Sequence, residues 1–425
     1  MPYIQLTPQT NEAYFNAIIA NDPFLNSMYP DVAALDYAST CNSILENSEM
    51  LNAFISTMVN KIGETIIRDA MISNPLAMFK GGILPFGKKI EDIFVEAATE
   101  HWFNQEEQEN EWFKREIPDV SVIYHVENRK SFFKVTISRD EMRGAMFNEY
   151  GLNDLEGKIV NSLYKGDYIS DFKYMKTLLN VYAQNGFYYP VAVPKLTDDN
   201  SAKALIKKVR EFVGLMQMPS NKYNSLNRTQ QYDKSDLVIF MTPATEATID
   251  VDVLAVAFHM DKAEFLSKVV LIDEMPKGIS MILTSKQFIV QRDTVFYTDV
   301  DKIGGGRYFN VQLNHDGIYS TCRFQNAIAF VETVPSVTGV TIDGGDTSMD
   351  KGTAKQFNAT VTGTENVYVP KAVEWSITGN TSKDTYINCV GLLVVSSLEK
   401  AESITITAKS IFDETKTATA TITFN

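Results

Sequence analysis

Three segments in the first half of the chain carry apolar residues at helical spacing. They are residues 51–72, 151–186 and 201–216. A repeat of three to four positions puts these side chains on one face, which predicts amphipathic helices with one buried side. We expect the first helix to end at Gly63. In the second segment, Ser170 or Asp171 is expected to cap the start of a helix that stops at Gly186.

Between residues 81 and 138 the pattern changes to that of β-strands. Two strand-forming stretches, ILPFGKKIEDIFVEA and VSVIYHVENRKSFFKVTI, flank the acidic stretch HWFNQEEQENEWFKRE. This order predicts a long β-hairpin with a charged tip. A two-stranded ribbon is at best marginally stable alone in water, so this one has to lie against its own domain or a neighbouring subunit.

The regions on either side of these elements are less regular. Residues 1–50 are rich in asparagine and are interrupted by Pro23 and Pro30, which predicts an extended arm with short helical pieces. Residues 236–332 mix strands with helical patterns at Val251–Phe258 and Lys262–Leu266. The glycines Gly304, Gly305 and Gly306 indicate a loop.

The chain changes character at Pro335. Beyond it, short threonine-rich strands such as VTGVTI, AVEWSI and TATATITF follow one another with frequent turns. This pattern predicts a β-sandwich. Val373, Trp375 and Ile377 alternate with polar residues, so we expect Trp375 to anchor the core of this domain.

Composition narrows the function classes. The chain has 425 residues, of which 44% are hydrophobic and 22% charged, and this predicts a globular protein of two or more domains. We expect neither a signal peptide nor a membrane span. Its three cysteines (Cys41, Cys322 and Cys389) lie far apart, which argues against a disulfide framework. The formal charge of −14 is opposite in sign to that of a duplex-binding protein. It indicates either simple solubility or the wall of a container that does not bind the nucleic acid packed inside it.

Several stretches resemble the major head proteins of small podoviruses of the phi-29-like group. They include NAFISTMVNKIGETIIRD, SNPLAMFKGGILPFGKKIEDIF, SDFKYMKTLLNVYAQNGF and DVDVLAVAFHMDKAEFLSKVVLID, and they run in order from about residue 52 to 273. The tail, from VTIDGG through VEWSITGN to TATATITF, resembles a bacterial group-2 immunoglobulin-like domain. That phage family carries such a domain in the same place.

The resemblance implies an α+β tailed-phage capsid fold of the Hong Kong 97 type plus an all-β immunoglobulin-like sandwich. The expected parts are an N-terminal arm at 1–50, a capsid body at 51–334 and an immunoglobulin-like domain at 335–425. Within the body we expect an extended hairpin loop at 81–138, a peripheral domain with a spine helix at 139–235, and a mainly axial domain with a return strand at 236–334.

The implied function is structural and is performed in the virion after assembly in the bacterial cytoplasm. Many copies, as pentamers and hexamers, would build an icosahedral or prolate head around double-stranded DNA without sequence-specific binding. A scaffolding protein and a portal or connector are the implied partners, with a head fibre or a host-surface polymer as further candidates. A phage or bacterial surface adhesin and a cell-wall glycosidase remain the alternatives.

No residue pattern supports catalysis, a cofactor or a metal. The stretch from Gly82 to Lys89 lacks the hydroxyl residue of a phosphate-binding loop, and neither His259 nor His315 has a nucleophile setting. The glutamates near residue 106 are better explained as a solvated tip than as a glycosidase pair. We therefore expect inter-subunit contacts from the acidic tip and nearby basic residues: Lys88, Lys89, Glu106, Glu107, Glu109, Arg115 and Arg129.

Overall fold

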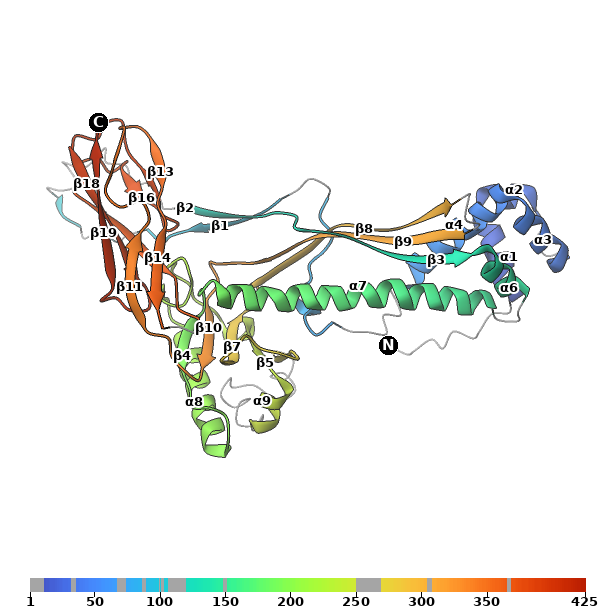
Figure 1. The fold of residues 1–425 in the computed structure, drawn as a ribbon, viewed down its shortest axis with the longest axis horizontal. Helices are drawn as coiled ribbons and strands as arrows, with labels where there is room; N and C mark the ends of the chain where they lie inside the picture. The colour runs from blue at the N-terminus through green and yellow to red at the C-terminus, as the bar shows by residue number, and fades with distance from the viewer. Residues whose placement is uncertain are drawn as a thin grey trace. The chain divides into compact units, whose positions relative to one another are not determined.

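The computed structural model describes most of the chain. The described residues are 11–31, 36–66, 74–85, 89–98, 100, 103–105, 120–147, 151–249, 269–303, 308–364 and 368–425 (Figure 1). They divide into two compact units. Unit 1 comprises Met1–Lys88, Glu127–Tyr174 and Gln291–Tyr319, and unit 2 comprises Lys89–Val126, Met175–Val290 and Ser320–Asn425. None of the helices described is long and apolar enough to cross a membrane.

Unit 1 opens with helices in the region where an extended arm with short helical pieces was predicted. These helices are α1 (Asn11–Asn21), α2 (Pro23–Met28), α3 (Tyr37–Glu46) and α4 (Ser48–Ile66), followed by a 3-10 turn (Ala77–Phe79). The predicted short helical pieces are therefore present, but they are packed rather than extended, because Phe15, Ile18 and Phe54 share one buried apolar cluster. Pro23 separates α1 from α2 and begins α2, since the first turn of a helix needs no backbone donor there. Gly63 lies inside α4 and does not end it.

A three-stranded sheet covers this cluster. Its order is β3 (Arg129–Ser138), β9 (Tyr308–Thr321), β8 (Ile289–Ile303), and β3 and β9 are antiparallel. Ile137, Val311 and Leu313 are buried in the same apolar cluster as the helices. Helix α6 (Arg139–Phe147) follows β3 directly.

The predicted hairpin is shorter than expected. It consists of β1 (Ile90–Val95) and β2 (Val120–His125), which pair antiparallel, whereas β3 pairs with β9. The chain changes partner at Asn128, whose side chain donates to the carbonyl of Tyr319 at 2.7 Å and accepts from its amide at 2.9 Å. These two bonds fix the start of β3 on β9, and the extension of the hairpin to residue 138 is corrected accordingly.

Helix α7 (Gly151–Gln184) is one uninterrupted helix of 34 residues. Ser170 and Asp171 lie in its middle, so the predicted cap is wrong. Asp171 is buried and binds basic side chains from other elements. The predicted stop is confirmed, because Gly186 adopts a φ of 66° and Phe187 donates to the carbonyl of Tyr182 at 3.2 Å.

The body of unit 2 is a five-stranded sheet packed against a helix. The strand order is β4 (Tyr189–Ala192), β10 (Ala327–Val331), β7 (Ile279–Ser285), β5 (Leu237–Met241) and β6 (Val269–Leu271). Helix α8 (Asp199–Leu215) buries its predicted apolar face against this sheet in one cluster. A 3-10 turn (Lys234–Asp236) precedes β5, and α9 (Pro243–Thr248) follows it. The predicted helices at Val251–Phe258 and Lys262–Leu266 and the loop at Gly304–Gly306 lie outside the described residues.

The C-terminal domain, residues 335–425, is all β as predicted. Its sheets have the orders β11-β14, β12-β19-β18-β15 and β13-β17-β16. The strands are β11 (Val337–Ile342), β12 (Thr347–Met349), β13 (Ala354–Gln356), β14 (Ala359–Gly363), β15 (Val373–Thr378), β16 (Tyr386–Ile387), β17 (Leu392–Val394), β18 (Ser403–Ser410) and β19 (Thr417–Phe424). Trp375 is half-buried and packs against both apolar clusters of this domain. Its immunoglobulin-like character stays a prediction.

Candidate functional site: the hairpin face and two buried polar clusters

The β1–β2 hairpin has one exposed face that is largely apolar. Because side chains alternate along a strand and cross-strand partners share a face, Ile93 and Val122 lie on the same side, as do Val95 and Val120. This outer face comprises Glu91, Ile93, Val95, Val120, Val122 and Tyr124. Ile93 and Tyr124 are 61% and 59% exposed. Adjacent apolar side chains left in water are typical of an interaction surface.

The inner face of the hairpin packs on its own unit. Phe94 and Ile123 lie against a small apolar cluster made by Leu226, Cys322 and Phe324. The rings of Phe94 and Phe324 have centroids 5.4 Å apart. The hairpin is therefore fixed from one side, which leaves the outer face as its free surface.

A histidine joins the base of the hairpin to the end of β9. His125 is buried, and its Nε2 lies 2.8 Å from Asp92 Oδ2 while its Nδ1 lies 2.7 Å from Ser320 Oγ. These are the residue types of a serine-hydrolase triad, but in those enzymes the serine binds Nε2 and the acid binds Nδ1. The connectivity here is reversed, and the three side chains act as a structural link between strands.

Unit 1 contains a buried network of charged side chains around Arg129. Its guanidinium donates to Asp167 at 2.6 Å and to Asp171. The other charged members are Lys80, Asp293 and His315. His315 is fully buried, with Nδ1 2.6 Å from Asp167 and Nε2 2.8 Å from Asp293. The network joins the segment after α4, strands β3, β8 and β9, and helix α7.

The charges in this network balance only when His315 is protonated. An imidazole that donates to a carboxylate at each nitrogen must carry both protons. Burial by itself would lower the pKa of His315, but the hydrogen bonds from its ring to Asp167 and Asp293 raise that pKa above its ordinary value. Burial would raise the pKa of Asp293, but His315 and Lys80 lower it. Three cations then face three carboxylates.

A metal ion is not the better explanation of this network. Among the residues described, the ligand atoms of Asp167, Asp171 and His315 do lie within 4.8 Å of one another. However, Arg129 donates to both aspartates and stacks over the ring of Tyr174 at 5.0 Å. A metal would have to displace this guanidinium, so we interpret the cluster as an ion-pair network that holds the fold.

Comparisons with known proteins agree with the fold. Residues 15–331 match the family model described as Phi29-like phage major capsid protein. The chain is 33% identical to the major capsid protein of Bacillus phage GA-1 over 371 residues, which cover 85% of this chain and 78% of that protein. It is 32% identical to the major capsid protein of Bacillus phage B103 over 400 residues, which cover 93% and 88%.

The chain belongs to the Phi29-like phage major capsid protein family. A solved capsid structure of Staphylococcus phage Andhra overlaps 63% of this chain and 86% of its own, with a TM-score of 0.52 at 14% identity, which shows a shared capsid fold. This capsid protein is accordingly a structural subunit that assembles in many copies into the shell of the virion head. It is not an enzyme, and the adhesin and glycosidase alternatives are set aside.

The residues predicted to form inter-subunit contacts have different outcomes. Lys89 is exposed at the start of β1 in the capsid protein. Arg129 was wrongly included, because it is 3% exposed and has its acidic partners within the chain. The remaining candidates lie outside the described residues: Lys88, Glu106, Glu107, Glu109 and Arg115.

Sequence reasoning missed the charged network of the capsid protein. One signal was available in α7, because Asp167 and Asp171 continue the buried face begun by Tyr164 and completed by Met175. Carboxylates on the apolar face of a helix require cationic partners elsewhere in the chain. Nothing in the sequence identifies those partners, since Arg129 lies 38 and 42 residues from these aspartates and Lys80 lies 91 residues from Asp171.

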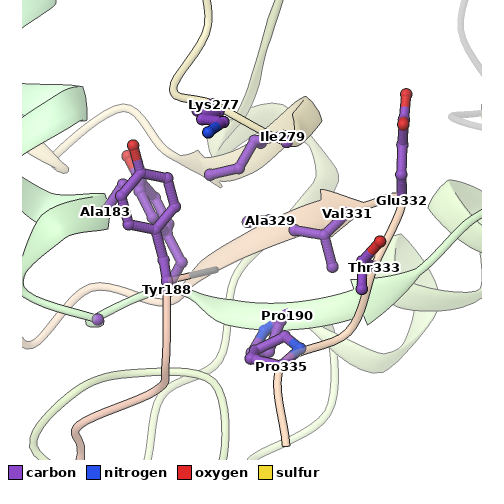
Figure 2. Close-up of a pocket in the computed structure, with 13 residues that line it drawn as sticks. Ala183, Tyr188, Pro190, Lys277, Ile279, Ala329, Val331, Glu332, Thr333 and Pro335 are labelled. Atoms are coloured by element: carbon purple, nitrogen blue, oxygen red, sulfur yellow. The ribbon is translucent and has the colours of Figure 1, made fainter. Parts of the chain in front are cut away.

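A cavity of about 180 Å³ lies between the end of α7, the five-stranded sheet and the C-terminal domain (Figure 2). Its wall is mostly apolar, with Ile279, Val331 and Pro335 among the lining residues. Tyr188, which also lines it, hydrogen-bonds the carbonyl of Leu179 at 3.4 Å. Small-molecule sites are usually several hundred Å³ with convergent polar groups. The cavity of the capsid protein therefore supports no ligand site.

Proposed function

We propose that each capsid subunit buries the outer face of its β1–β2 hairpin against a neighbouring copy of the same chain. The supporting observation is the exposed apolar face itself. Four of its side chains, Ile93, Val95, Val120 and Tyr124, are about half exposed or more. In a shell of identical subunits every copy offers the same face, so the contact repeats around each capsomer and weak individual contacts add up.

A pair of nearly isosteric substitutions tests this proposal. Val95→Thr and Val122→Thr together keep the shape of the face but add two hydroxyl groups that a tight contact would have to desolvate. We expect the isolated subunit to fold as before and the yield of shells, counted by negative-stain electron microscopy after expression with the scaffold, to fall at least tenfold. An unchanged shell yield would argue that this face does not join subunits.

The larger assembly is a separate proposal. We propose pentamers and hexamers that form an icosahedral or prolate head, built around a scaffolding protein and a portal or connector. The head would enclose double-stranded DNA without reading its sequence, which fits the net charge of −14. At physiological salt, the repulsion between the acidic capsid wall and the DNA phosphates would act only within about 8 Å. It would therefore oppose binding of the DNA to the wall only at close range.

The acidic segment after β1 is a second proposed contact. We propose that Glu106, Glu107 and Glu109 meet basic groups of a neighbour, with Lys88, Lys89 and Arg115 as candidates. Reversing the three glutamates to lysine is expected to impair assembly. Subunits that still form shells in normal yield would exclude this contact.

The C-terminal domain is proposed to be an immunoglobulin-like module that reinforces contacts between capsomers. Its compact all-β build and its own apolar core support this role. Removal of residues 335–425 is expected to give shells that form but fall apart at raised temperature. Stable shells with slower host adsorption would instead assign the domain to surface decoration, such as contact with a host-surface polymer or a head fibre.

A further inference from the structure

The C-terminal domain meets the end of helix α7 by a backbone-to-backbone contact at Gly186. The amide of Lys371 donates to the carbonyl of Gly186 at 2.8 Å. A Cβ atom at position 186 would lie 2.0 Å from the carbonyl oxygen of Val369. A residue with a side chain at position 186 would therefore push the segment around Val369 away from the end of α7. The φ of 66° at Gly186 also favours glycine. In Figure 1 the end of α7 lies at the base of the C-terminal strands.

Side-chain contacts flank this point. The ring of Phe412 from the C-terminal domain packs edge-on against Tyr189 of β4, with centroids 5.8 Å apart. Lys222 Nζ lies 3.6 Å from Glu414 Oε1. These contacts hold the domain against the body of its own subunit.

A second contact links the C-terminal domain to the loop end of the hairpin, where Ser121 pairs with Phe94. Cys389 Sγ lies 3.4 Å from Ser121 Oγ on β2, and Ser121 also accepts from Arg228 of the body at 2.7 Å. Cys389 packs in the same cluster as Phe94 and Ile123, the apolar inner face of the hairpin. Hairpin, body and C-terminal domain therefore meet at Ser121.

We propose that the C-terminal domain is an intramolecular buttress, docked at Gly186 and Cys389, that fixes the loop end of its own β1–β2 hairpin. The buttress complements the proposed function, because a hairpin held at both ends presents its outer face in one orientation. A two-stranded ribbon needs such support to stay ordered before a neighbour arrives. The role differs from reinforcement between capsomers, since it acts within one unassembled chain.

Hydrogen exchange on the unassembled full-length subunit tests the buttress. In Gly186→Ala we expect the amide of Lys371 and the paired amides of β1 and β2 to exchange at least tenfold faster than in the unchanged protein. Gly278→Ala is the matched control, because Gly278 also has a positive φ of 79° but an added Cβ would meet nothing within 4 Å. In this control the exchange of the hairpin should stay the same.

Two results would overturn the proposal. One is unchanged hydrogen exchange at the amide of Lys371 in Gly186→Ala, which would show that the C-terminal domain is not docked at Gly186. The other is faster exchange at Lys371 with no change in β1 and β2, which would show that the docked domain does not stabilise the hairpin. If Gly186→Ala does not fold, Cys389→Asp tests the same link by placing a charge beside Ser121, and it must also speed exchange in β2. Because no assembly is involved, these outcomes are independent of whether the outer face joins subunits.

Discussion

Replacing Ile93 by aspartate is the sharpest perturbation of the outer hairpin face. Full burial of an isoleucine side chain stabilises a contact by about 1.5–3 kcal/mol. Ile93 is 61% exposed, so a neighbour that covers it would gain roughly 1–2 kcal/mol. An aspartate forfeits this gain and adds a desolvation cost of roughly 1–2 kcal/mol or more. Together these weaken each contact by about 3 kcal/mol, or roughly 100-fold.

The assay is sedimentation velocity across a concentration series, with electron microscopy of the products. We expect the concentration needed for shell formation to rise at least tenfold for Ile93→Asp and only a fewfold for Ile93→Ala. The free energy of unfolding of the unassembled subunit, measured by thermal unfolding, should change by less than about 1 kcal/mol, because the side chain of Ile93 is mostly in water. Leu398→Asp, which changes a 76% exposed leucine of the C-terminal domain, is the control for an added surface charge. Normal assembly of Ile93→Asp at the usual concentration would refute the reasoning.

Three further predictions concern stability. Arg129→Met should destabilise the subunit by about 3–5 kcal/mol in urea unfolding, because it removes the guanidinium that pairs with two buried carboxylates. Lys130→Met, at an exposed pair, should leave the urea midpoint nearly unchanged, and equal effects of the two substitutions would argue against the network. The raised pKa of His315 means that its contribution is complete below an ordinary imidazole pKa of about 6.5 and is lost as the pH rises through the folded value. The urea midpoint should thus fall as the pH rises above about 6.5, and this fall should shrink in His315→Phe; an unchanged slope would contradict it. Glu399→Ala should destabilise the C-terminal domain by roughly 1–3 kcal/mol, because this buried carboxylate accepts hydrogen bonds from the amides of Thr381 and Ala401. The domain should then unfold at a lower temperature, and an unchanged transition would argue against a stabilising role of Glu399.

Local patterns in the sequence were sufficient for the elements whose burial follows a simple period. Helix α8 buries Leu205, Val209 and Val213 as its spacing predicts, and β15 contains Val373, Trp375 and Ile377 as their alternation predicts. In these elements one face packs against the core and the other is in water, so the spacing of the apolar residues matches the spacing of the buried positions.

Long-range partners explain most of the differences. Asp171 has the residue type of a helix cap, and its partners Arg129 and Lys80, 42 and 91 residues earlier, explain why it can be buried inside α7. Strand β3 could have continued the hairpin, but Asn128 turns it onto β9, 191 residues later in the sequence. Short helices before α4 were predicted, but their packing was not, because prolines and asparagines dominate that region although Phe15 and Ile18 lie in its core.

The candidate site was only half predictable. The hairpin and its need for a partner surface follow from the sequence, and both faces of its strands carry apolar residues. Alternation alone therefore cannot say which face is free. The structure decides this, because Phe94 and Ile123 are covered by the subunit itself while Ile93 and Val122 are not.

Hydroxyl-radical footprinting of Tyr124 in free subunits and in assembled shells tests the subunit contact most directly. This side chain is 59% exposed on the outer hairpin face, and Tyr386 of the C-terminal domain, 49% exposed, provides a reference in the same chain. We predict that oxidation of Tyr124 relative to Tyr386 falls at least fivefold on assembly. An equal oxidation ratio in free subunits and shells would contradict burial of this face by a neighbour.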